Sequence, residues 1–273
     1  MRDDWHASRT DGWKNYWKDD DTHPSAPYAT FQCMEITEED SSKIEVDVII
    51  ENKFKLIVNG VHITTFFASP LELRELVVGF LLCEGLLKSP DKLNFIDFSE
   101  GAITCDANLP RSRLEQWRQL QESDDFTSLQ ESMTSIFSNV YFKKDVIFNV
   151  MEHFRKKARS WRRTGGTHSS IVCHHNGDII SFCEDVSRSC SIDKAVGKAA
   201  LSGFDFDNCA LMTTGRLSSV IVGKAVRAGF PLIASKAAPV SDAIKLAEHA
   251  GITLVAFARK PDLYVYTQTQ RVI

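Results

Sequence analysis

Three loops in the second half of the chain combine basic side chains with small or hydroxyl-bearing residues. Each follows a short apolar run that predicts a buried strand, and the first two precede predicted helices at 218–228 and 242–250. The first N–H groups of a helix have no partner within it, so with nearby arginine or lysine they attract anions. The loops therefore predict a site for a nucleotide or a phosphate-rich cofactor. Its candidate residues are Thr214, Gly215, Arg216, Ser235, Lys236, Phe257, Ala258, Arg259, Lys260, Pro261 and Asp262.

A fourth segment places two glycines directly before a histidine. Gly165 and Gly166 would let the backbone approach a ligand closely, and His168 could donate to phosphate or transfer a proton. A glycine turn followed by a packed histidine is the alternative. Further on, Arg188 follows Glu184 and Asp185, so it either forms a buried ion pair with them or faces a phosphate.

One cluster has the composition of a metal site: Cys173, His174 and His175, with Cys183 nearby. The two histidines lie at a predicted hairpin tip, where alternation directs neighbouring side chains to opposite faces. No Cys-x-x-Cys pair occurs in the sequence. We expect no structural metal.

The elements around the loops predict how they come together. Predicted strands at 210–213, 231–234 and 252–257 alternate with helices at 193–201, 218–228 and 242–250. Short strand–helix–strand links produce a parallel sheet with right-handed crossovers. The carboxyl ends of its strands share one edge, where ligands bind. In any single loop, the glycine and serine residues could serve only to form turns and helix caps. Three basic loops on one edge favour a binding site over this alternative.

The first half predicts a smaller mixed unit. A strand is expected at 44–50, a hairpin turns at Asn59-Gly60, and two more strands lie within 94–105. Ser69 and Glu72 form a predicted capping box for a helix ending near Leu87. A short helix is predicted from Arg111, followed by an irregular connection and an amphipathic helix at 145–161. A second hairpin, which turns at Asn176-Gly177, follows that helix.

These elements divide the chain into four segments of an α/β protein with an α+β N-terminal part. Residues 1–42 are an acidic extension expected to lie on the body or remain mobile, and 43–109 form a small α+β domain. Residues 110–143 are an irregular or helical connection, and 144–273 form the α/β domain.

Composition excludes several classes of protein. The net charge of −4 gives no overall attraction to nucleic acid or to an acidic membrane surface. The most apolar stretch, 76–87, is too short to span a bilayer, and no secretory signal is recognisable. Seven cysteines without an export signal are expected to be reduced thiols, which places the protein in the cytoplasm.

Taken in order, the motifs resemble the FdhD/NarQ family of formate dehydrogenase accessory proteins, from about residue 52 to residue 273. They are Asn59-Gly60, Leu76 to Gly85, Thr164-Gly165-Gly166-Thr167-His168, Glu184-Asp185-Val186 with Arg188, Asp193-Lys194, Thr214-Gly215-Arg216, Ser235 with Ala238-Pro239, and the tail from Phe257 to Thr267.

The resemblance implies a homodimer whose larger domain has a cytidine-deaminase-like, three-layer α/β/α fold. It implies that sulfur passes from a cysteine desulfurase to molybdenum bis-guanine-dinucleotide cofactor, which formate dehydrogenase then receives. The family's cofactor-binding segment corresponds to residues 257–262, in agreement with the loops above.

Two departures from the family concern this chemistry. The family's Cys-Gly-x-Cys-Gly loop corresponds to residues 115–130, which contain no cysteine, and the family's Arg-His-Asn reads Arg188-Ser189-Cys190. Sulfur transfer needs a thiolate, and Cys190 is the best-placed remaining candidate. The chain is therefore either a sulfur carrier using another cysteine or a non-catalytic cofactor-binding chaperone. A zinc deaminase is excluded because His168 is followed by Ser169-Ser170 and no Pro-Cys-x-x-Cys exists.

Overall fold

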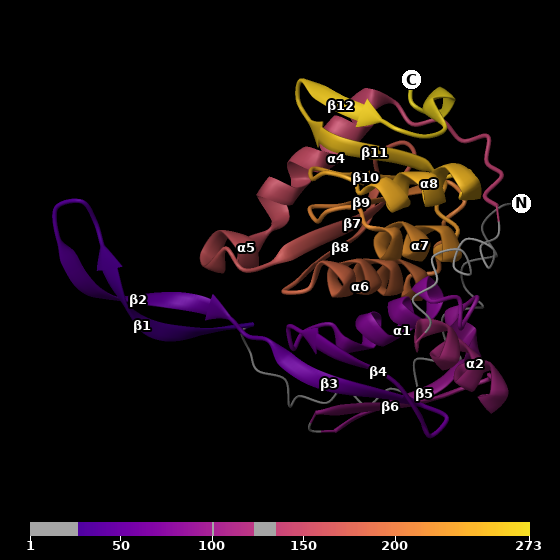
Figure 1. The fold of residues 1–273 in the computed structure, drawn as a ribbon, viewed down its shortest axis with the longest axis horizontal. Coiled ribbons are helices and arrows are strands. Elements are labelled where there is room, and N and C mark those ends of the chain that lie inside the picture. Colours follow the sequence, from indigo (N-terminus) through magenta and orange to yellow (C-terminus); the bar gives the residue numbers. More distant parts are fainter. Residues whose placement is uncertain (1–26, 100, 123–134) are drawn as a thin grey trace, which may run out of the picture.

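The computed structural model describes residues 27–99, 101–122 and 135–273. Its largest element is a six-stranded sheet in the order β12-β11-β10-β9-β7-β8 (Figure 1). The strands are β7 (His168–His174), β8 (Ile179–Asp185), β9 (Cys209–Thr213), β10 (Leu232–Ser235), β11 (Thr253–Arg259) and β12 (Asp262–Val265). Strands β9, β10 and β11 are parallel, as predicted, whereas β7 and β12 run antiparallel to their neighbours. The sequence did not predict β12.

Helices cover both faces of this sheet. Helix α4 (Lys144–Lys157) packs Ile147 and Met151 against Ile171 and Met212 on one face. Helices α6 (Arg188–Leu201), α7 (Ser219–Ala228) and α8 (Ser241–Ala250) cover the other face (Figure 1). Alternate strand residues point to opposite faces, so each strand contributes to both cores.

The single amphipathic helix predicted at 145–161 is wrong, because the chain forms α4 and then a separate α5 (Arg159–Thr164). The break lies at Ala158, which has ψ 80°. Arg162 donates to the carbonyl oxygens of Arg155 and Lys156 at 2.7 and 2.8 Å, so it satisfies the end of α4.

The N-terminal half forms a four-stranded sheet in the order β4-β3-β6-β5. Its strands are β3 (Asn52–Val58), β4 (Val61–Ala68), β5 (Leu93–Ser99) and β6 (Ala102–Ala107). The hairpin at Asn59-Gly60 is confirmed, since both residues have positive φ. Two helices, α1 (Leu73–Cys83) and α2 (Arg111–Glu122), accompany this sheet, and short 3-10 turns lie at Pro90–Lys92 and Thr269–Arg271. Residues 123–134 of the predicted connection lie outside the described residues.

Two predicted helix starts and one helix end are wrong. Helix α1 begins at Leu73 and ends at Cys83 rather than near Leu87, and no side chain caps its start. Ser69 does not form the capping box because its hydroxyl binds Asp185 and Lys194, far away in sequence. Helix α6 begins at Arg188, five residues earlier than the predicted start at 193, since Ser187 accepts a cap bond from the Cys190 N–H.

The N-terminal extension contains regular structure that its composition did not predict. Strands β1 (Tyr28–Ile36) and β2 (Ser41–Ile49) form a two-stranded antiparallel ribbon that projects from the body (Figure 1). The strand predicted at 44–50 is therefore confirmed, whereas the strand at 28–36, within the predicted acidic extension, was not expected. The alternation of apolar and polar residues in 28–36 is short and ends among acidic residues at the tip of the ribbon. Residues 1–26 lie outside the described residues.

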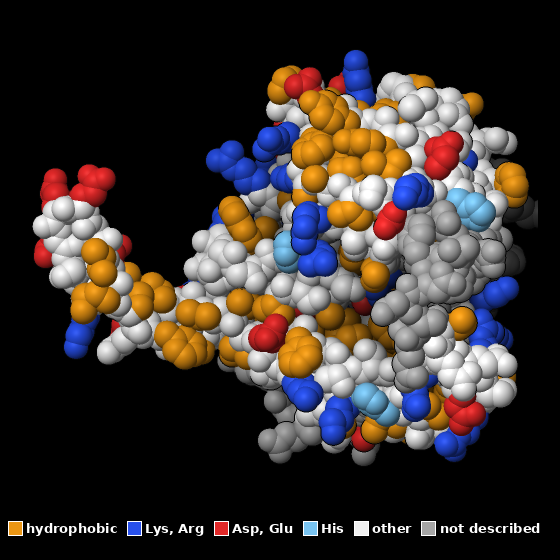
Figure 2. All heavy atoms as spheres, in the orientation of Figure 1, with side chains coloured by type: hydrophobic (Ala, Val, Ile, Leu, Met, Phe, Trp, Pro, Cys, Tyr) orange, Lys and Arg blue, Asp and Glu red, His pale blue; other side chains and the backbone are white. Residues whose placement is uncertain are grey.

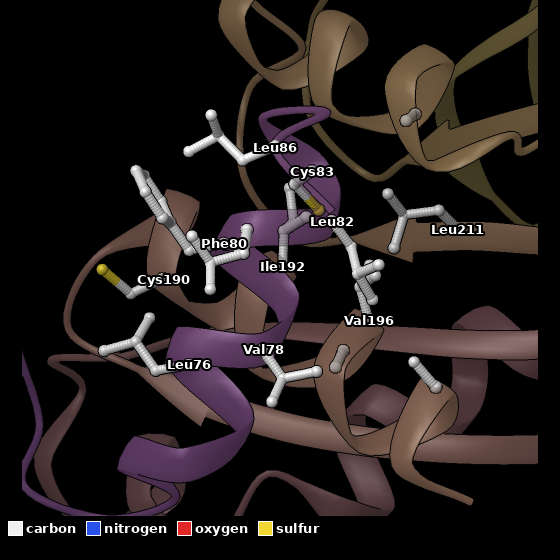
Figure 3. Close-up of a cluster of buried hydrophobic side chains, with 14 of the residues drawn as sticks. Leu76, Val78, Phe80, Leu82, Cys83, Leu86, Cys190, Ile192, Val196 and Leu211 are labelled. Atoms are coloured by element: carbon white, nitrogen blue, oxygen red, sulfur yellow. The ribbon is translucent and has the colours of Figure 1, made fainter. Parts of the chain in front are cut away.

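The two halves meet where α1 crosses α6. A Cβ atom built on Gly79 would lie 1.7 Å from the carbonyl oxygen of Asp193, and one on Gly197 would lie 2.0 Å from that of Glu75. The two helix backbones are thus in direct contact. Leu76, Phe80 and other side chains surround the crossing (Figure 3), and one apolar core continues from the small sheet to the large one. Among the described residues no helix is both long and apolar enough to cross a membrane.

Replacing Gly79 or Gly197 by alanine is expected to lower the free energy of unfolding by about 3 kcal/mol or more. Overpacking costs about 1–3 kcal/mol when neighbours can yield, and here the neighbours are backbone atoms. Urea unfolding measures the loss. Gly203→Ala is the control, because no atom lies within 4 Å of its added methyl group and positive φ alone costs about 1–2 kcal/mol. Equal losses in all three variants would show that the helices are not in contact.

Candidate functional site

The predicted binding residues gather at one edge of the six-stranded sheet. Strands β9, β10 and β11 end there, and pairing of His168 with Asp185 and of Ser170 with Thr213 brings the start of β7 and the end of β8 to the same edge. Helices α6, α7 and α8 begin at this edge. The structure therefore brings together the loops that the sequence identified separately.

Hydroxyl groups hold neighbouring loops together. The Ser235 hydroxyl donates to the Gly215 carbonyl oxygen at 2.6 Å and accepts from the Ala237 N–H at 3.0 Å. The Thr214 hydroxyl accepts from the Ser169 N–H at 3.0 Å. Ser235 is fully buried, so it shapes the edge instead of facing solvent.

Three arginines at the edge are exposed: Arg188, Arg216 and Arg259. None of them forms a salt bridge with another described residue. Helices α7 and α8 also begin here, and the side chains of Ser218 and Val240, which precede them, do not cap them. The edge thus combines unneutralised positive charge with hydrogen-bond donors.

The two lysines of these loops are engaged with α4. Lys260 pairs with Glu152 at 3.1 Å. The ammonium group of Lys236 lies 5.4 Å from the centre of the Phe154 ring. Burial, followed by repulsion from Arg155, lowers the pKa of Lys236. The arginines are therefore better placed than the lysines to bind an anion.

Arg188 is not in a buried ion pair with the carboxylates that precede it. Asp185 instead pairs with Lys194 at 2.6 Å, and both side chains are fully buried. Ser69 joins this pair, since its hydroxyl donates to Asp185 at 2.9 Å and accepts from Lys194 at 3.1 Å. Sequence reasoning missed Ser69 and Lys194 as partners, because no local pattern shows a contact between residues so far apart. The pairing leaves Arg188 exposed.

The glycine segment has structural contacts of its own. Gly165 has φ 70° and ends α5, and a Cβ on Gly166 would lie 2.6 Å from the Ile49 side chain. Glu184 accepts from the Ser160 and Trp161 N–H groups at 3.0 and 2.9 Å, so it caps α5. Ile49 occupies the space beside Gly166, whereas His168 is near enough to Arg188 to feel its charge.

His168 is half-buried at the start of β7. Burial lowers its pKa below 6.5, and the positive charge of Arg188 lowers it further, while Asp185 acts in the opposite direction. A lowered pKa leaves the imidazole neutral at pH 7, when one ring nitrogen donates and the other accepts. A bound anion would favour the protonated form.

Residues 257–262 include an irregular turn of the sheet. Phe257 has φ 52°, and the pairing of β11 with β12 shifts register between Ala256 and Arg259. A residue other than glycine in this region costs about 1–2 kcal/mol. The distortion leaves Ala258 buried and Arg259 exposed, and local strain of this kind is frequent at functional sites.

The cysteines do not form a reactive centre at the edge. Six of the seven are buried and only Cys33 is exposed. Burial raises the pKa of Cys190 to about 12, and the same cause raises the pKa of Cys105 and Cys173 to about 12. These groups are thiols at neutral pH, whereas sulfur chemistry needs the thiolate. Cys190, the best-placed candidate from sequence, is thus poorly suited to carry sulfur.

The side chains of the Cys/His cluster make contacts of other kinds. In residues 27–99, 101–122 and 135–273, no three His, Cys, Asp or Glu side chains are arranged to hold a metal ion. The ring centres of His174 and His175 lie 4.3 Å apart, with the ring planes tilted by 48° to each other. Cys173 points instead to the Ala210 carbonyl oxygen.

Replacing Arg188 by glutamine is expected to raise the pKa of His168, because it removes a nearby positive charge. NMR titration of the His168 ring protons measures this directly. Arg216→Gln is the matched control and should leave the His168 titration unchanged. An unchanged His168 pKa in Arg188→Gln would mean that the two side chains are not neighbours in solution.

Comparison with known proteins places these features in a family. Residues 49–273 match the profile of the FdhD/NarQ family. The sulfur carrier protein FdhD of Methanothermobacter thermautotrophicus is 32% identical over 240 residues, covering 86% of this chain and 95% of that protein. The FdhD protein of Listeria monocytogenes is 31% identical over 244 residues, covering 84% of this chain and 93% of the relative.

The fold has a solved counterpart. The crystal structure of a candidate formate dehydrogenase accessory protein from Desulfotalea psychrophila superposes with a TM-score of 0.76 at 24% identity, covering 91% of this chain and 100% of that one. The similarity therefore extends over both the small sheet and the six-stranded sheet. From sequence and fold together, the chain belongs to the FdhD/NarQ family.

Proposed function

We propose that this protein is a formate dehydrogenase accessory protein that binds molybdenum bis-guanine-dinucleotide cofactor at the sheet edge. The observation that carries this proposal is the group of three exposed arginines without carboxylate partners among the described residues, at an edge where three helices begin. The names of the relatives, sulfur carrier proteins and a formate dehydrogenase accessory protein, support a role that serves formate dehydrogenase.

The residues present fit the anionic part of such a cofactor. Arginine binds phosphate oxygens through two parallel N–H groups, so Arg188, Arg216 and Arg259 would hold phosphates. The first N–H groups of α7 and α8 would add neutral donors, and His168 would donate or become protonated beside the anion. The bound cofactor would supply the molybdenum centre that formate dehydrogenase uses.

The positions of the cysteines favour the chaperone form of this function, in which the protein holds the cofactor without carrying sulfur itself. Six thiols are buried, and the window that corresponds to the family's cysteine loop contains none. Sulfur transfer from a cysteine desulfurase is a second candidate function. It would have to use Cys33, the exposed cysteine on β1.

Several finer features belong to the same proposal. A cytidine-deaminase-like arrangement of residues 144–273 is supported by helices on both faces of a sheet whose β7 runs antiparallel to β9. A homodimer, a cytoplasmic location and direct contact with formate dehydrogenase are expected from the family. Seven free cysteines are consistent with a reducing compartment.

Calorimetry with GDP as a probe of the guanine-dinucleotide end tests the site. Wild type is expected to bind, and Arg216→Ala and Arg259→Ala should each weaken binding about tenfold, because charge-assisted hydrogen bonds contribute about 1.5–3 kcal/mol. Arg111→Ala, which removes an exposed arginine on α2 that pairs with Glu115, is the control and should bind like wild type. The site is misplaced if wild type does not bind GDP or if all three variants bind equally.

Replacing Cys105 and Cys190 by serine, singly and together, should leave GDP affinity within a factor of about three, a shift near 0.65 kcal/mol. Both thiols are buried, so neither is expected to contact the nucleotide. A larger loss in either variant would show that its thiol lines the pocket.

Intact-mass spectrometry after incubation with a cysteine desulfurase and cysteine separates the two functions. The chaperone proposal expects no added sulfur atom on any cysteine. An adduct that disappears in Cys33→Ser would instead establish sulfur transfer through β1.

A further inference from the structure

The end of α4 and the short helix α5 together form a basic surface. Figure 2 shows basic side chains on the side of the body from which the ribbon projects. None of the residues of this surface forms a salt bridge with another described residue. We call them the basic α4–α5 surface, and its exposed members are Arg155, Lys156, Lys157, Arg159 and Arg162.

Three carboxylates near this surface have partners of their own. Glu152 pairs with Lys260 at 3.1 Å, and Asp47 pairs with Arg163 at 2.5 Å. Glu184 accepts hydrogen bonds from two backbone N–H groups at the start of α5. The described part of the chain therefore leaves the basic α4–α5 surface with an excess of positive charge.

The chain enters the described structure beside this surface. The carbonyl oxygen of Pro27 accepts from the Ile50 N–H at 2.7 Å, which holds Pro27 at the base of the ribbon. The next residue, Tyr28, has its ring centre 4.1 Å from the guanidinium carbon of Arg163, on α5. The residues that precede Pro27 are therefore tethered next to α5.

Those preceding residues have the complementary charge. Residues 19–26 contain three consecutive aspartates, Asp19, Asp20 and Asp21, and no lysine or arginine. Asp21 lies six residues before Pro27, and six extended residues reach up to roughly 20 Å. A single exposed ion pair contributes little, but a tether of this kind gives an effective concentration in the millimolar range. The family profile begins at residue 49, so this segment lies outside the family match.

We propose that residues 19–26 dock on the basic α4–α5 surface of the same chain, with their aspartates beside its lysines and arginines. The contact is intramolecular. It also places negative charge next to the proposed nucleotide site, because Glu184, at the edge end of β8, holds the start of α5. The docked segment therefore screens the attraction of the sheet edge for anions. Only this screening rests on the proposed function, and the docking stands without it.

A zero-length crosslink tests the docking in the full-length protein. A water-soluble carbodiimide should join an aspartate of residues 19–21 to Lys156 or Lys157, and mass spectrometry of peptides from the monomer band locates the link. Lys53 and Lys55 of β3 are the internal control, because they are exposed and follow the base of the ribbon closely in sequence. A segment without a docking site would reach them as well. Sodium chloride at about 1 M should suppress the link, since it shortens the Debye length to about 3 Å.

Replacing Asp19, Asp20 and Asp21 together by asparagine should expose the two lysines of the surface. A short pulse of N-hydroxysuccinimide acetate is expected to acetylate Lys156 and Lys157 at least about threefold faster in this variant, because the weak ion pairs that protect their amines are lost. The matched control removes the same charge from the ribbon tip (Figure 2) by Glu35→Gln, Glu38→Gln and Glu39→Gln. These acids project away from the body, so the control should label like wild type.

Calorimetry with GDP tests the screening. The aspartate variant is expected to bind GDP about threefold more tightly than wild type, because repulsion beside the edge is removed. The ribbon-tip control should bind like wild type. If wild type does not bind GDP, the nucleotide site fails and the screening fails with it, while the crosslink and the acetylation rates still decide the docking.

Four results would overturn these inferences. Links confined to a covalent dimer would place the segment on a second copy. Absence of links to Lys156 and Lys157, or equal links to Lys53 and Lys55, would show that the segment has no docking site on α4 and α5. Equal acetylation rates in the aspartate variant and the ribbon-tip control would reduce the effect to overall charge. Equal GDP affinity in wild type and the aspartate variant would remove the screening.

Discussion

The close crossing of α1 and α6 is the constraint on which the rest of the structure depends. Gly79 and Gly197 face each other so closely that a methyl group on either would overlap a backbone carbonyl of the other helix. Backbone contact at this point fixes the distance between the small sheet and the layer of helices on the large sheet. Because both glycines lie within helices, where glycine costs about 1 kcal/mol relative to alanine, the packing they permit must outweigh that cost.

Buried charges reinforce the same junction. Lys194 of α6 pairs with Asp185 and binds Ser69 just before α1, and Lys224 of α7 pairs with Asp193 and with Glu84 at the end of α1. Loss of one partner from such a pair typically costs about 3–5 kcal/mol, since the other charge is left buried alone. The pairs therefore specify one relative position of the helices. Asp185 is thereby paired with Lys194 rather than with Arg188, whose side chain is exposed at the sheet edge.

The site follows from that arrangement of charge. Burial removes six cysteines from chemistry by raising the pKa of their thiols or excluding solvent, whereas the arginines stay exposed and charged. The fold thus presents exposed arginines at the sheet edge, where we propose that the cofactor binds, and six buried thiols. Cofactor binding and sulfur transfer are physically separable, because the first needs only donors and positive charge and the second needs a thiolate.

The sequence by itself determined the parallel strands, the hairpin turns at Asn59-Gly60 and Asn176-Gly177, the loops that meet at the edge, and the family. These depend on local patterns: periodicity, turn residues with positive φ, and order along the chain. Only the tertiary structure decided that Asp185 pairs with Lys194 rather than with Arg188, that Ser69 is a bridging residue rather than a helix cap, and that Gly166 accommodates Ile49. It also decided that α4 and α5 are separate and that residues 28–36 form an arm. Each of these depends on a partner distant in sequence, or on a competing hydrogen bond, and a side chain's own neighbours along the chain do not identify that partner.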